Sequence, residues 1–277
     1  MLAALALLAA SAAPAACTPI EGAEKLWASR DTRWIFFGEL HGANEIPDAF
    51  ANLVCLAAVA RGPVTVALEF PTDMQASLDA WLASDGGDAA RTRLLAAPWW
   101  HRPLQDGRSS AAFLHMLERL RVLHASGKVV SVRAFDVPPT WRGQTDRNAD
   151  MAKTLTSIAA ETRGLVLILA GNIHAMRSDL QFGATVIHPA ASLLPDANRI
   201  SVDVRGVGGS AWNCGPDGCK ARSMGVGGSG PAGLTWSSAP DRKFDVVYAL
   251  DEPLTAAEPA VPGVADTKPP ASAIIKP

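Results

Sequence analysis

Two short segments of this sequence place a histidine three residues after a glycine, directly behind an apolar run. They are residues 38–41, Gly-Glu-Leu-His, and residues 171–174, Gly-Asn-Ile-His. Imidazole exchanges protons near neutral pH, and a neighbouring carboxylate fixes its tautomer. Glu39 stands two residues before His41, so the first segment supplies an acid and a base together. We therefore predict acid–base chemistry centred on residues 38–42.

Carboxylates also stand at the ends of two other apolar runs, as Glu69 and Asp136. Ligands of an open parallel sheet bind outside the carboxyl ends of its strands. Four strand ends would therefore bring Glu39 with His41, Glu69, Asp136 and His174 to one edge. Each residue alone has a structural explanation, because acids favour helix starts and a single histidine can be a satisfied core residue. Glu69 is flanked by apolar residues, and an ionised carboxylate buried there needs a cation, a metal or several donors.

The elements that must position these residues follow from the hydrophobic pattern. Six apolar, β-branched runs have the length of buried strands: Trp34–Glu39, Val64–Phe70, Val129–Asp136, Leu165–Asn172, Arg199–Arg205 and Phe244–Leu250. Helical patterns lie between many of them, at Ile46–Val59, around Phe113–Leu123 and around Met151–Ile158. This alternation predicts an α/β fold: a mainly parallel central sheet flanked by helices on both faces, in a single domain.

The two ends of the chain differ from this pattern. Residues 1–16 are nearly all Ala, Leu, Ser and Pro, which is typical of a secretory signal peptide. We expect the α/β domain over residues 17–253 and a disordered Pro/Ala-rich tail over residues 254–277. The protein would then be exported, and either periplasmic or lipid-anchored at the cell envelope. The anchor would sit on Cys17, which directly follows small residues; ordinary cleavage near Ala16 is the simpler interpretation.

The 277 residues are 48% hydrophobic and carry a net charge of −2. That balance leaves no basic field for nucleic acid, and the dispersed charges exclude a polybasic membrane patch. A membrane would be reached only through the lipid anchor. We expect a small-molecule or peptide substrate as the partner.

The cysteines suggest different roles. Cys214 and Cys219 enclose Gly-Pro-Asp-Gly, a turn that would bring two thiols together, so we predict a local disulfide there. The surrounding Gly-rich stretch, residues 206–233, is predicted to be a long surface loop. Cys55 lies in an apolar helical run and is expected to be a buried free thiol.

Further polar and aromatic residues could line a site, although each also has a purely structural explanation. Arg108 and Arg177 could be anion anchors or solvated charges, and Trp100 could line a pocket or cap the core. Arg147 opens a helix and could reach back to a carboxylate. Glu45 lies in the first turn of its helix, where an acid also favours the helix dipole.

Three of these segments resemble a known superfamily. Residues 38–45, Gly-Glu-Leu-His-Gly-Ala-Asn-Glu, resemble the Gly-Glu-x-x-His-Gly-x-x-Glu signature of erythromycin esterase-like proteins, with one residue fewer before the histidine. Residues 147–152 resemble the Arg-Asp-x-x-Met-Ala helix start of those esterases, and residues 167–177 resemble their strand ending in His-Asn-x-His-x-x-Arg. Gly171 replaces their second histidine. The superfamily also includes ChaN-like haem-binding lipoproteins and Tiki/TraB proteins.

The resemblance implies a hydrolase of ester or amide bonds. His41 would be the general base, oriented by Glu39 or Glu69, and His174 with Arg108 would stabilise the oxyanion. The substrate-binding residues would be Glu45, Trp100, Asp136, Arg147 and Arg177. A serine nucleophile is not expected, since no Gly-x-Ser-x-Gly elbow occurs.

Two variants of this hypothesis stay open. The Tiki-like relatives imply a metal, and Glu39, His41, Glu69 and His174 would suit Zn²⁺, Mn²⁺ or Fe²⁺. Alternatively, the same cluster would bind haem, iron or another ligand without catalysis, as the ChaN-like resemblance implies. Haem is less favoured, because ChaN-like proteins use tyrosine and the only tyrosine, Tyr248, falls inside a predicted strand.

Overall fold

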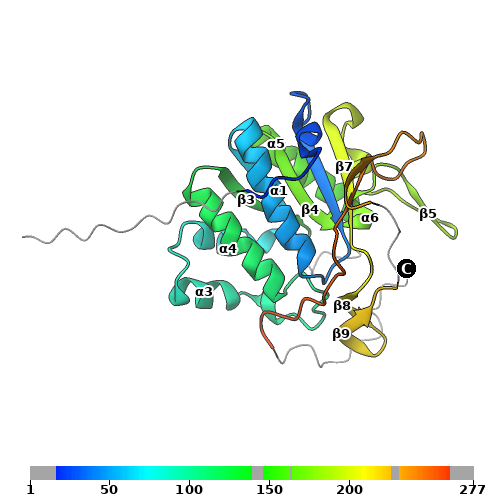
Figure 1. Ribbon diagram of the computed structural model, residues 1–277. Coiled ribbons are helices and arrows are strands. Elements are labelled where there is room, and N and C mark those ends of the chain that lie inside the picture. Colours follow the sequence, from blue (N-terminus) through cyan, green and yellow to red (C-terminus); the bar gives the residue numbers. More distant parts are fainter. Residues whose placement is uncertain (1–16, 139–145, 163, 226–230, 263–277) are drawn as a thin grey trace, which may run out of the picture.

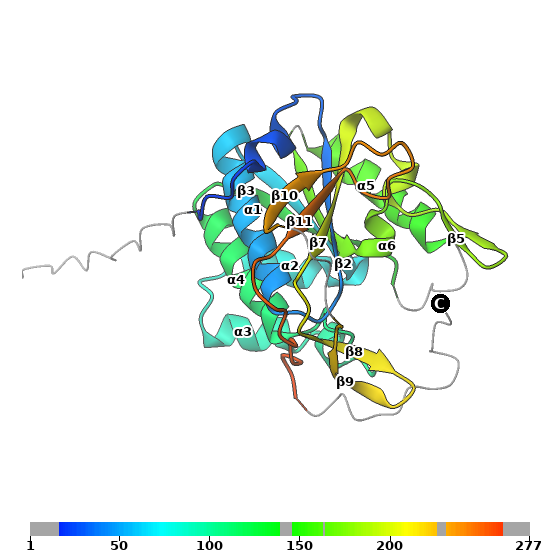
Figure 2. The ribbon, with the colours of Figure 1, turned by 45° about the vertical axis from the view of Figure 1, so that its right-hand side comes forward.

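The structure is a computed structural model that describes residues 17–138, 146–162, 164–225 and 231–262. A seven-stranded sheet in the order β10-β11-β7-β1-β4-β2-β3 forms its centre (Figures 1 and 2). Only β10 pairs antiparallel in this sheet. The strands are β1 Trp34–Glu39, β2 Val64–Pro71, β3 Val129–Asp136, β4 Val166–Gly171, β7 Arg199–Arg205, β10 Gly233–Trp236 and β11 Val246–Ala249.

Helices cover both faces of the sheet, as predicted. One face carries α1 Glu45–Arg61, α2 Gln75–Leu82, α3 Asp88–Leu95 and α4 Ala111–Ala125. The other carries α5 Arg147–Glu161 and the short α6 Asn172–Ala175. Strand β1 shows why its first four residues are all apolar: Ile35 and Phe37 enter the first core, whereas Trp34 and Phe36 enter the second. A strand buried on both faces needs a continuous apolar run rather than an alternating one.

Short elements connect these layers. The 3-10 helices are η1 Ala23–Trp27, η2 Thr72–Met74, η3 Pro98–His101, η5 Ala191–Leu193 and η6 Asp196–Asn198. Two antiparallel hairpins stand outside the main sheet: β5 Leu180–Phe182 with β6 Thr185–Ile187, and β8 Ser210–Gly215 with β9 Gly218–Ser223. In the described part of the chain, no helix has the length and apolarity needed to cross a membrane.

The predicted surface loop over residues 206–233 is wrong in part, because it contains the hairpin β8–β9 and the start of β10. Cys214 and Cys219 face each other across the hairpin and form the predicted disulfide. Glycines at both ends of the segment hide the alternating pattern that would otherwise indicate strands.

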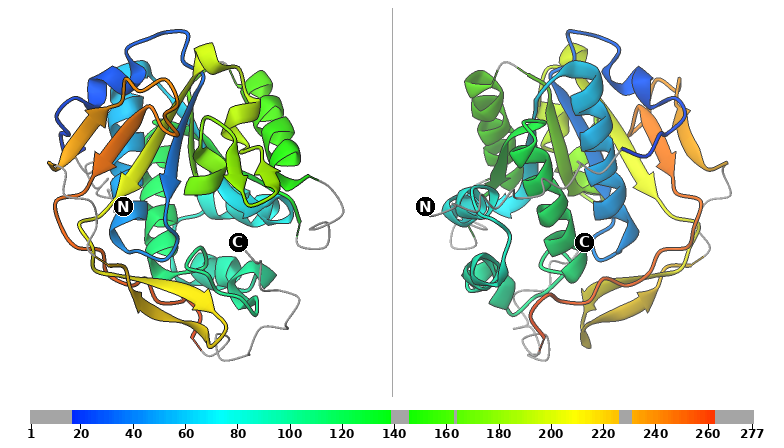
Figure 3. Two further views of the ribbon diagram at one scale, coloured as in Figure 1. Left: turned by 90° about the vertical axis from the view of Figure 1, so that its right-hand side faces the viewer. Right: turned by 60° about the vertical axis from the view of Figure 1, so that its left-hand side comes forward.

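The tail predicted to be disordered from residue 254 instead packs on the domain as far as residue 262. Ala256 bridges Ala43, Pro259 bridges Ser110, and Ala257 is fully buried. Figure 3 shows this segment running beside hairpin β8–β9 past the carboxyl end of the sheet. Backbone hydrogen bonds to neighbouring loops replace the apolar periodicity that the sequence lacks. The rest of the predicted tail, residues 263–277, lies outside the described residues, as does the predicted signal peptide.

The expectation of a free thiol at Cys55 is wrong, since its sulfur is bonded to Cys17. The sequence offered no local signal for this pair, because 38 residues separate its members. The bond also occupies the sulfur that a lipid anchor on Cys17 would need. Cleavage near Ala16 stays a prediction, since residues 1–16 lie outside the described residues.

Candidate active site

Glu39 and His41 form a hydrogen-bonded pair at the end of β1. Glu39 Oε1 lies 2.8 Å from His41 Nδ1, which leaves Nε2 pointing toward Glu69 Oε2 at 3.8 Å. Burial and the Arg108 charge would lower the pKa of His41, but the Glu39 hydrogen bond and the charges of Glu39 and Glu69 outweigh them. The net effect raises the pKa of His41 above its ordinary value of 6.5. Its side chain remains 21% exposed, so water and a substrate can reach it.

Glu69 occupies the centre of the cluster, and its side chain is 3% exposed. Oε1 accepts hydrogen bonds from Arg108 and, at 2.7 Å, from Arg147, while Oε2 accepts from the Gly171 backbone N–H at 2.6 Å. Burial alone would raise the pKa of Glu69, but the positive charges around it, foremost that of Arg108 and also that of Arg147, hold it well below the ordinary range. A buried carboxylate at this position was predicted to need cations and hydrogen-bond donors, and Arg108 and Arg147 provide both.

Asp136, at the end of β3, fixes the position of Arg147. Its oxygens accept from Arg147 Nε at 2.8 Å and Nη2 at 2.7 Å, in the bidentate geometry that suits a guanidinium. Asp146 caps α5 by accepting from the Asn148 and Ala149 backbone N–H groups, so the helix begins at Arg147. From this position the Arg147 side chain extends over the carboxyl end of the sheet to Asp136 and Glu69.

His174 lies in α6 and is engaged at both ring nitrogens. Nε2 lies 2.9 Å from Arg147 Nη1, and Nδ1 lies 2.6 Å from Asn148 Oδ1. Arg147 can only donate, so Nε2 accepts and the proton resides on Nδ1. Burial is the main cause that lowers the pKa of His174 to about 4, with a further contribution from the Arg147 charge. This imidazole is neutral at pH 7.

A loop before α4 completes the cluster with a carboxylate between two arginines. Asp106 accepts from Arg102 and, through Oδ2 at 2.7 Å, from Arg108 Nη2. Burial would raise the pKa of Asp106, but these two cations hold it well below its ordinary value. The Arg102 guanidinium also stacks 3.8 Å above the Trp99 ring. Both partners of Asp106 come from its own loop, so no strand end in the sequence points to this carboxylate.

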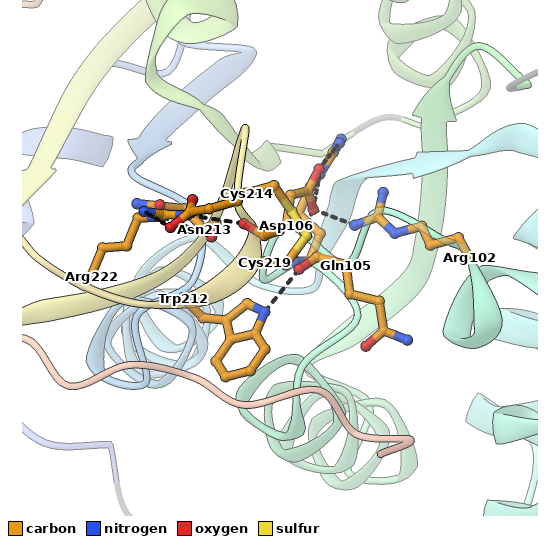
Figure 4. Close-up of a disulfide and its surroundings, with 11 residues drawn as sticks. Arg102, Gln105, Asp106, Trp212, Asn213, Cys214, Cys219 and Arg222 are labelled. Atoms are coloured by element: carbon orange, nitrogen blue, oxygen red, sulfur yellow. Dashed lines mark hydrogen bonds and ion pairs between the residues drawn. A yellow bond between two sulfur atoms is a disulfide. The ribbon is translucent and has the colours of Figure 1, made fainter. Parts of the chain in front are cut away.

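Hairpin β8–β9 holds this loop against the turn after β1. The Trp212 backbone N–H donates to Gly42 O at 2.7 Å, and its indole N–H donates to Gln105 O at 3.0 Å (Figure 4). Gly42 has φ +93° and Gly107 has φ +95°; a Cβ on Gly42 would overlap the Trp212 backbone, and a Cβ on Gly107 would overlap the Gly42 backbone. Glycine is needed at both positions for this approach.

Gly42→Ala should therefore disrupt the site. An added Cβ would overlap the Trp212 carbonyl, so the hairpin and the 105–108 loop must move away from His41. We expect a lower melting temperature and loss of any activity that depends on His41. Gly22→Ala is the matched control, because Gly22 also has a positive φ of 79° but has nothing within 4 Å of an added Cβ. Equal losses in both variants would show that backbone strain alone, rather than this contact, is responsible.

The structure thus brings together seven of the residues selected from the sequence: Glu39, His41, Glu69, Arg108, Asp136, Arg147 and His174. Three others lie elsewhere. Trp100 is fully buried in the core, and Glu45 accepts hydrogen bonds from Thr255 on the returning tail. Arg177 forms ion pairs with Asp196 and Asp245 at the far side of α6. Glu45 lines a separate surface pocket with Asn44 and Asp48, and the substrate-binding role of these three residues stays a prediction.

Sequence reasoning missed Asp106 as a member of the site and did not anticipate how Asn148 acts. Asn148 accepts from the Ala190 backbone N–H as well as from His174, so it fixes the imidazole to the chain. Its position beside Arg147 at a helix start was the available signal.

A divalent metal does not fit the cluster as arranged. The oxygens of Glu69 are taken by Arg108, Arg147 and Gly171, and both nitrogens of His174 are engaged. Among the residues that the structure describes, no group of three or more His, Cys, Asp or Glu side chains could hold a metal ion. Haem ligation by tyrosine is not supported at this cluster, since Tyr248 lies on β11 and packs into the core.

Neither a known family model nor a curated protein matches the sequence. Solved structures do match it in shape. A mutant of erythromycin esterase EreC in its open conformation overlaps with a TM-score of 0.65 at 11% identity, over 84% of this chain and 93% of that one. A succinoglycan biosynthesis protein overlaps with a TM-score of 0.57 at 11% identity, over 86% and 91%.

The haem-binding ChaN of Campylobacter jejuni overlaps with a TM-score of 0.45 at 11% identity, over 82% of this chain and 91% of that one. This overlap is too loose to bear on the site. Structural similarity at 11% sequence identity establishes the fold alone. The predicted resemblance to erythromycin esterase-like proteins is therefore confirmed for the fold.

Proposed function

We propose that the protein hydrolyses ester or amide bonds, with His41 as the general base. One observation carries the proposal: His41 Nε2 is the basic imidazole nitrogen of the cluster that makes no hydrogen bond among the described residues. Glu39 holds the ring through Nδ1 and keeps the proton there. The second oxygen of Glu39 is buried without a partner in the described part of the chain, so its charge is available to stabilise the imidazolium.

The reaction would proceed by attack of water. His41 Nε2 takes a proton from a water molecule while the hydroxide forms a bond with the carbonyl carbon. The carbonyl electrons move to oxygen, and the tetrahedral intermediate collapses as the bond to the leaving group breaks. The imidazolium then returns its proton to the leaving oxygen or nitrogen, which restores neutral His41.

The positive charges of Arg108 and Arg147 would stabilise the oxyanion. Arg147 is the more exposed of the two, at 24% of its side chain against 6% for Arg108. His174 would act indirectly, because its Nε2 accepts from Arg147 and presents no N–H to a substrate. Its contribution would be to position Arg147, which differs from the oxyanion role that the sequence suggested.

The pH dependence of kcat/KM tests this assignment. His41 must be neutral to act as base, so activity should rise with pH through its raised pKa, above 6.5. Glu39→Gln removes the charge that raises this pKa, so the midpoint should move to lower pH and the maximal rate should fall. The matched control is Glu24→Gln, an exposed carboxylate in η1. A midpoint that stays in place in Glu39→Gln would contradict the His41 assignment.

The binding alternative makes the opposite prediction for turnover. A protein that only binds its ligand would hydrolyse no member of an ester and amide panel, yet would retain haem, iron or another ligand when purified. Titration of haem and of Fe²⁺, read by absorbance and calorimetry, decides between the two functions.

We also propose that the protein is exported, with residues 1–16 as the signal peptide. Two disulfides, Cys17–Cys55 and Cys214–Cys219, suit an oxidising compartment such as the periplasm. The mass of the protein from its native cell should correspond to a chain beginning at Cys17 with four oxidised cysteines. A lipid-modified mass would favour the envelope anchor instead.

A further inference from the structure

The surface pocket that contains Glu45 is an acidic cavity of about 490 Å³. It is bounded by α1, by one residue of α4, by the chain that follows β11, and by residues 18–20. Four carboxylates line it, those of Glu45, Asp48, Asp251 and Glu252, against the single guanidinium of Arg119. None of the residues grouped around the proposed base lines it, so it is a separate site. Its volume lies in the range of small-molecule pockets.

The four carboxylates differ in how far they are already compensated. Asp48 pairs with Arg119, and Glu45 accepts hydrogen bonds from the returning tail. Both also lie in the first turn of α1, where the helix dipole favours acids. Asp251 and Glu252 have neither explanation, because both are exposed after β11 and form no ion pair among the described residues. Negative charge therefore stays uncompensated at the β11 side of the cavity.

A buried tyrosine lines the same side of the cavity. Tyr248 is 9% exposed, and its ring joins the core that α1 covers. The Tyr248 hydroxyl makes no hydrogen bond within the described part of the chain. Burial, with the Asp251 charge, raises the pKa of Tyr248 above its ordinary value of 10.0, so the hydroxyl lies near that carboxylate. A hydroxyl left without a protein partner at a cavity wall favours a ligand that donates to it.

The spacing of the carboxylates indicates which class of cation fits. In the described ranges, no three acidic side chains come close enough together to hold one metal ion. A chain that carries several ammonium groups can instead reach separate carboxylates. Its methylene groups would pack on Ile20, Ala49 and Leu250, which form part of the apolar lining. An ammonium group can also donate to the Tyr248 hydroxyl and lie against its ring.

We propose that this cavity binds a small linear polyamine, with one ammonium group at Tyr248 and Asp251 and another at Glu45. The inference goes beyond the proposed hydrolase and does not depend on it, because the cavity and the His41 cluster share no lining residue. Binding would be reversible and would require no covalent step.

Calorimetric titration of the full chain with spermidine tests the site. The wild type should bind one spermidine per chain. The uncharged 1,8-octanediol, a chain of similar length, should not bind, and Mg²⁺ should bind far more weakly than spermidine. Equal affinities for Mg²⁺ and spermidine would overturn the proposal, because general attraction to negative charge would then suffice.

Two variants separate the tyrosine from the acidic charge. Tyr248→Phe should raise the Kd for spermidine about tenfold, since a hydrogen bond to a charged group is lost. Its melting temperature should stay unchanged, because the hydroxyl has no partner among the described residues. The double variant Asp251→Asn with Glu252→Gln should raise the Kd about five- to tenfold. Asp241→Asn, an exposed carboxylate outside the cavity, is the matched control and should keep the wild-type Kd.

The other outcomes of this series would overturn the site. A weaker Kd in the acidic double variant alone would indicate general charge attraction, and an unchanged Kd in every variant would place the ligand elsewhere. Backbone NMR locates it directly: spermidine should shift the amide signals of Tyr248 and Asp251 and leave those of Glu39 and His41 in place. Shifts confined to Glu39 and His41 would place the polyamine in the candidate active site and overturn the separate cavity.

Discussion

His41→Gln is expected to lower kcat by about 10²- to 10⁴-fold, the range that a positioned general base contributes. Glutamine can keep a hydrogen bond to Glu39, but it cannot take a proton from water. Steady-state kinetics on a hydrolysed ester would measure the loss, and thermal unfolding should show little change. His115→Gln is the control, because His115 is 66% exposed on α4. Full activity in His41→Gln would remove the basis of the proposed mechanism.

Glu69→Gln is expected to destabilise the fold by about 3 kcal/mol, the lower end of the range for breaking a buried ion pair. The substitution leaves Arg108 and Arg147 with less compensating charge, although Asp106 and Asp136 still contact them. Chemical denaturation at neutral pH would measure the change. Glu161→Gln is the matched control, since that exposed carboxylate pairs with Arg133 on the surface and its loss should leave the free energy of unfolding nearly unchanged.

The same variant has a pH signature. The pKa of Glu69 is lower in the folded protein than in the unfolded chain, so its stabilisation is fully present above the unfolded value of about 4.3 and is lost as pH falls through the folded pKa. The wild type should thus lose more stability than Glu69→Gln between pH 5 and the acid limit. Parallel stability curves for the two proteins would contradict a charged Glu69 in the cluster.

Much of the site could be predicted because strand ends are visible in the sequence. Continuous apolar runs located β1, β2, β3 and β4, and parallel pairing brings their carboxyl ends to one edge whatever the loop lengths. This argument placed Glu39, Glu69 and Asp136 correctly relative to one another. It needs only local pattern and the rule for parallel sheets.

The remaining features depend on contacts that no local pattern reveals. Arg177 follows His174 by three residues, yet it turns to Asp245, which belongs to the loop before β11. Glu45 follows His41 by four residues, but the returning tail covers it through Thr255. Cys17 forms a disulfide with Cys55 because the chain before η1 packs against α1. Each outcome is set by tertiary packing between distant segments.

The carbonyl of Gly42 accepts two backbone hydrogen bonds, from Trp212 at 2.7 Å and from Ala257 at 2.8 Å. Both partners are made long after His41 during synthesis. A chain that emerges from the ribosome amino end first therefore lacks both of these hydrogen bonds until residues 212 and 257 have been added, so the turn beside the proposed base is completed only with the carboxyl-terminal part of the domain.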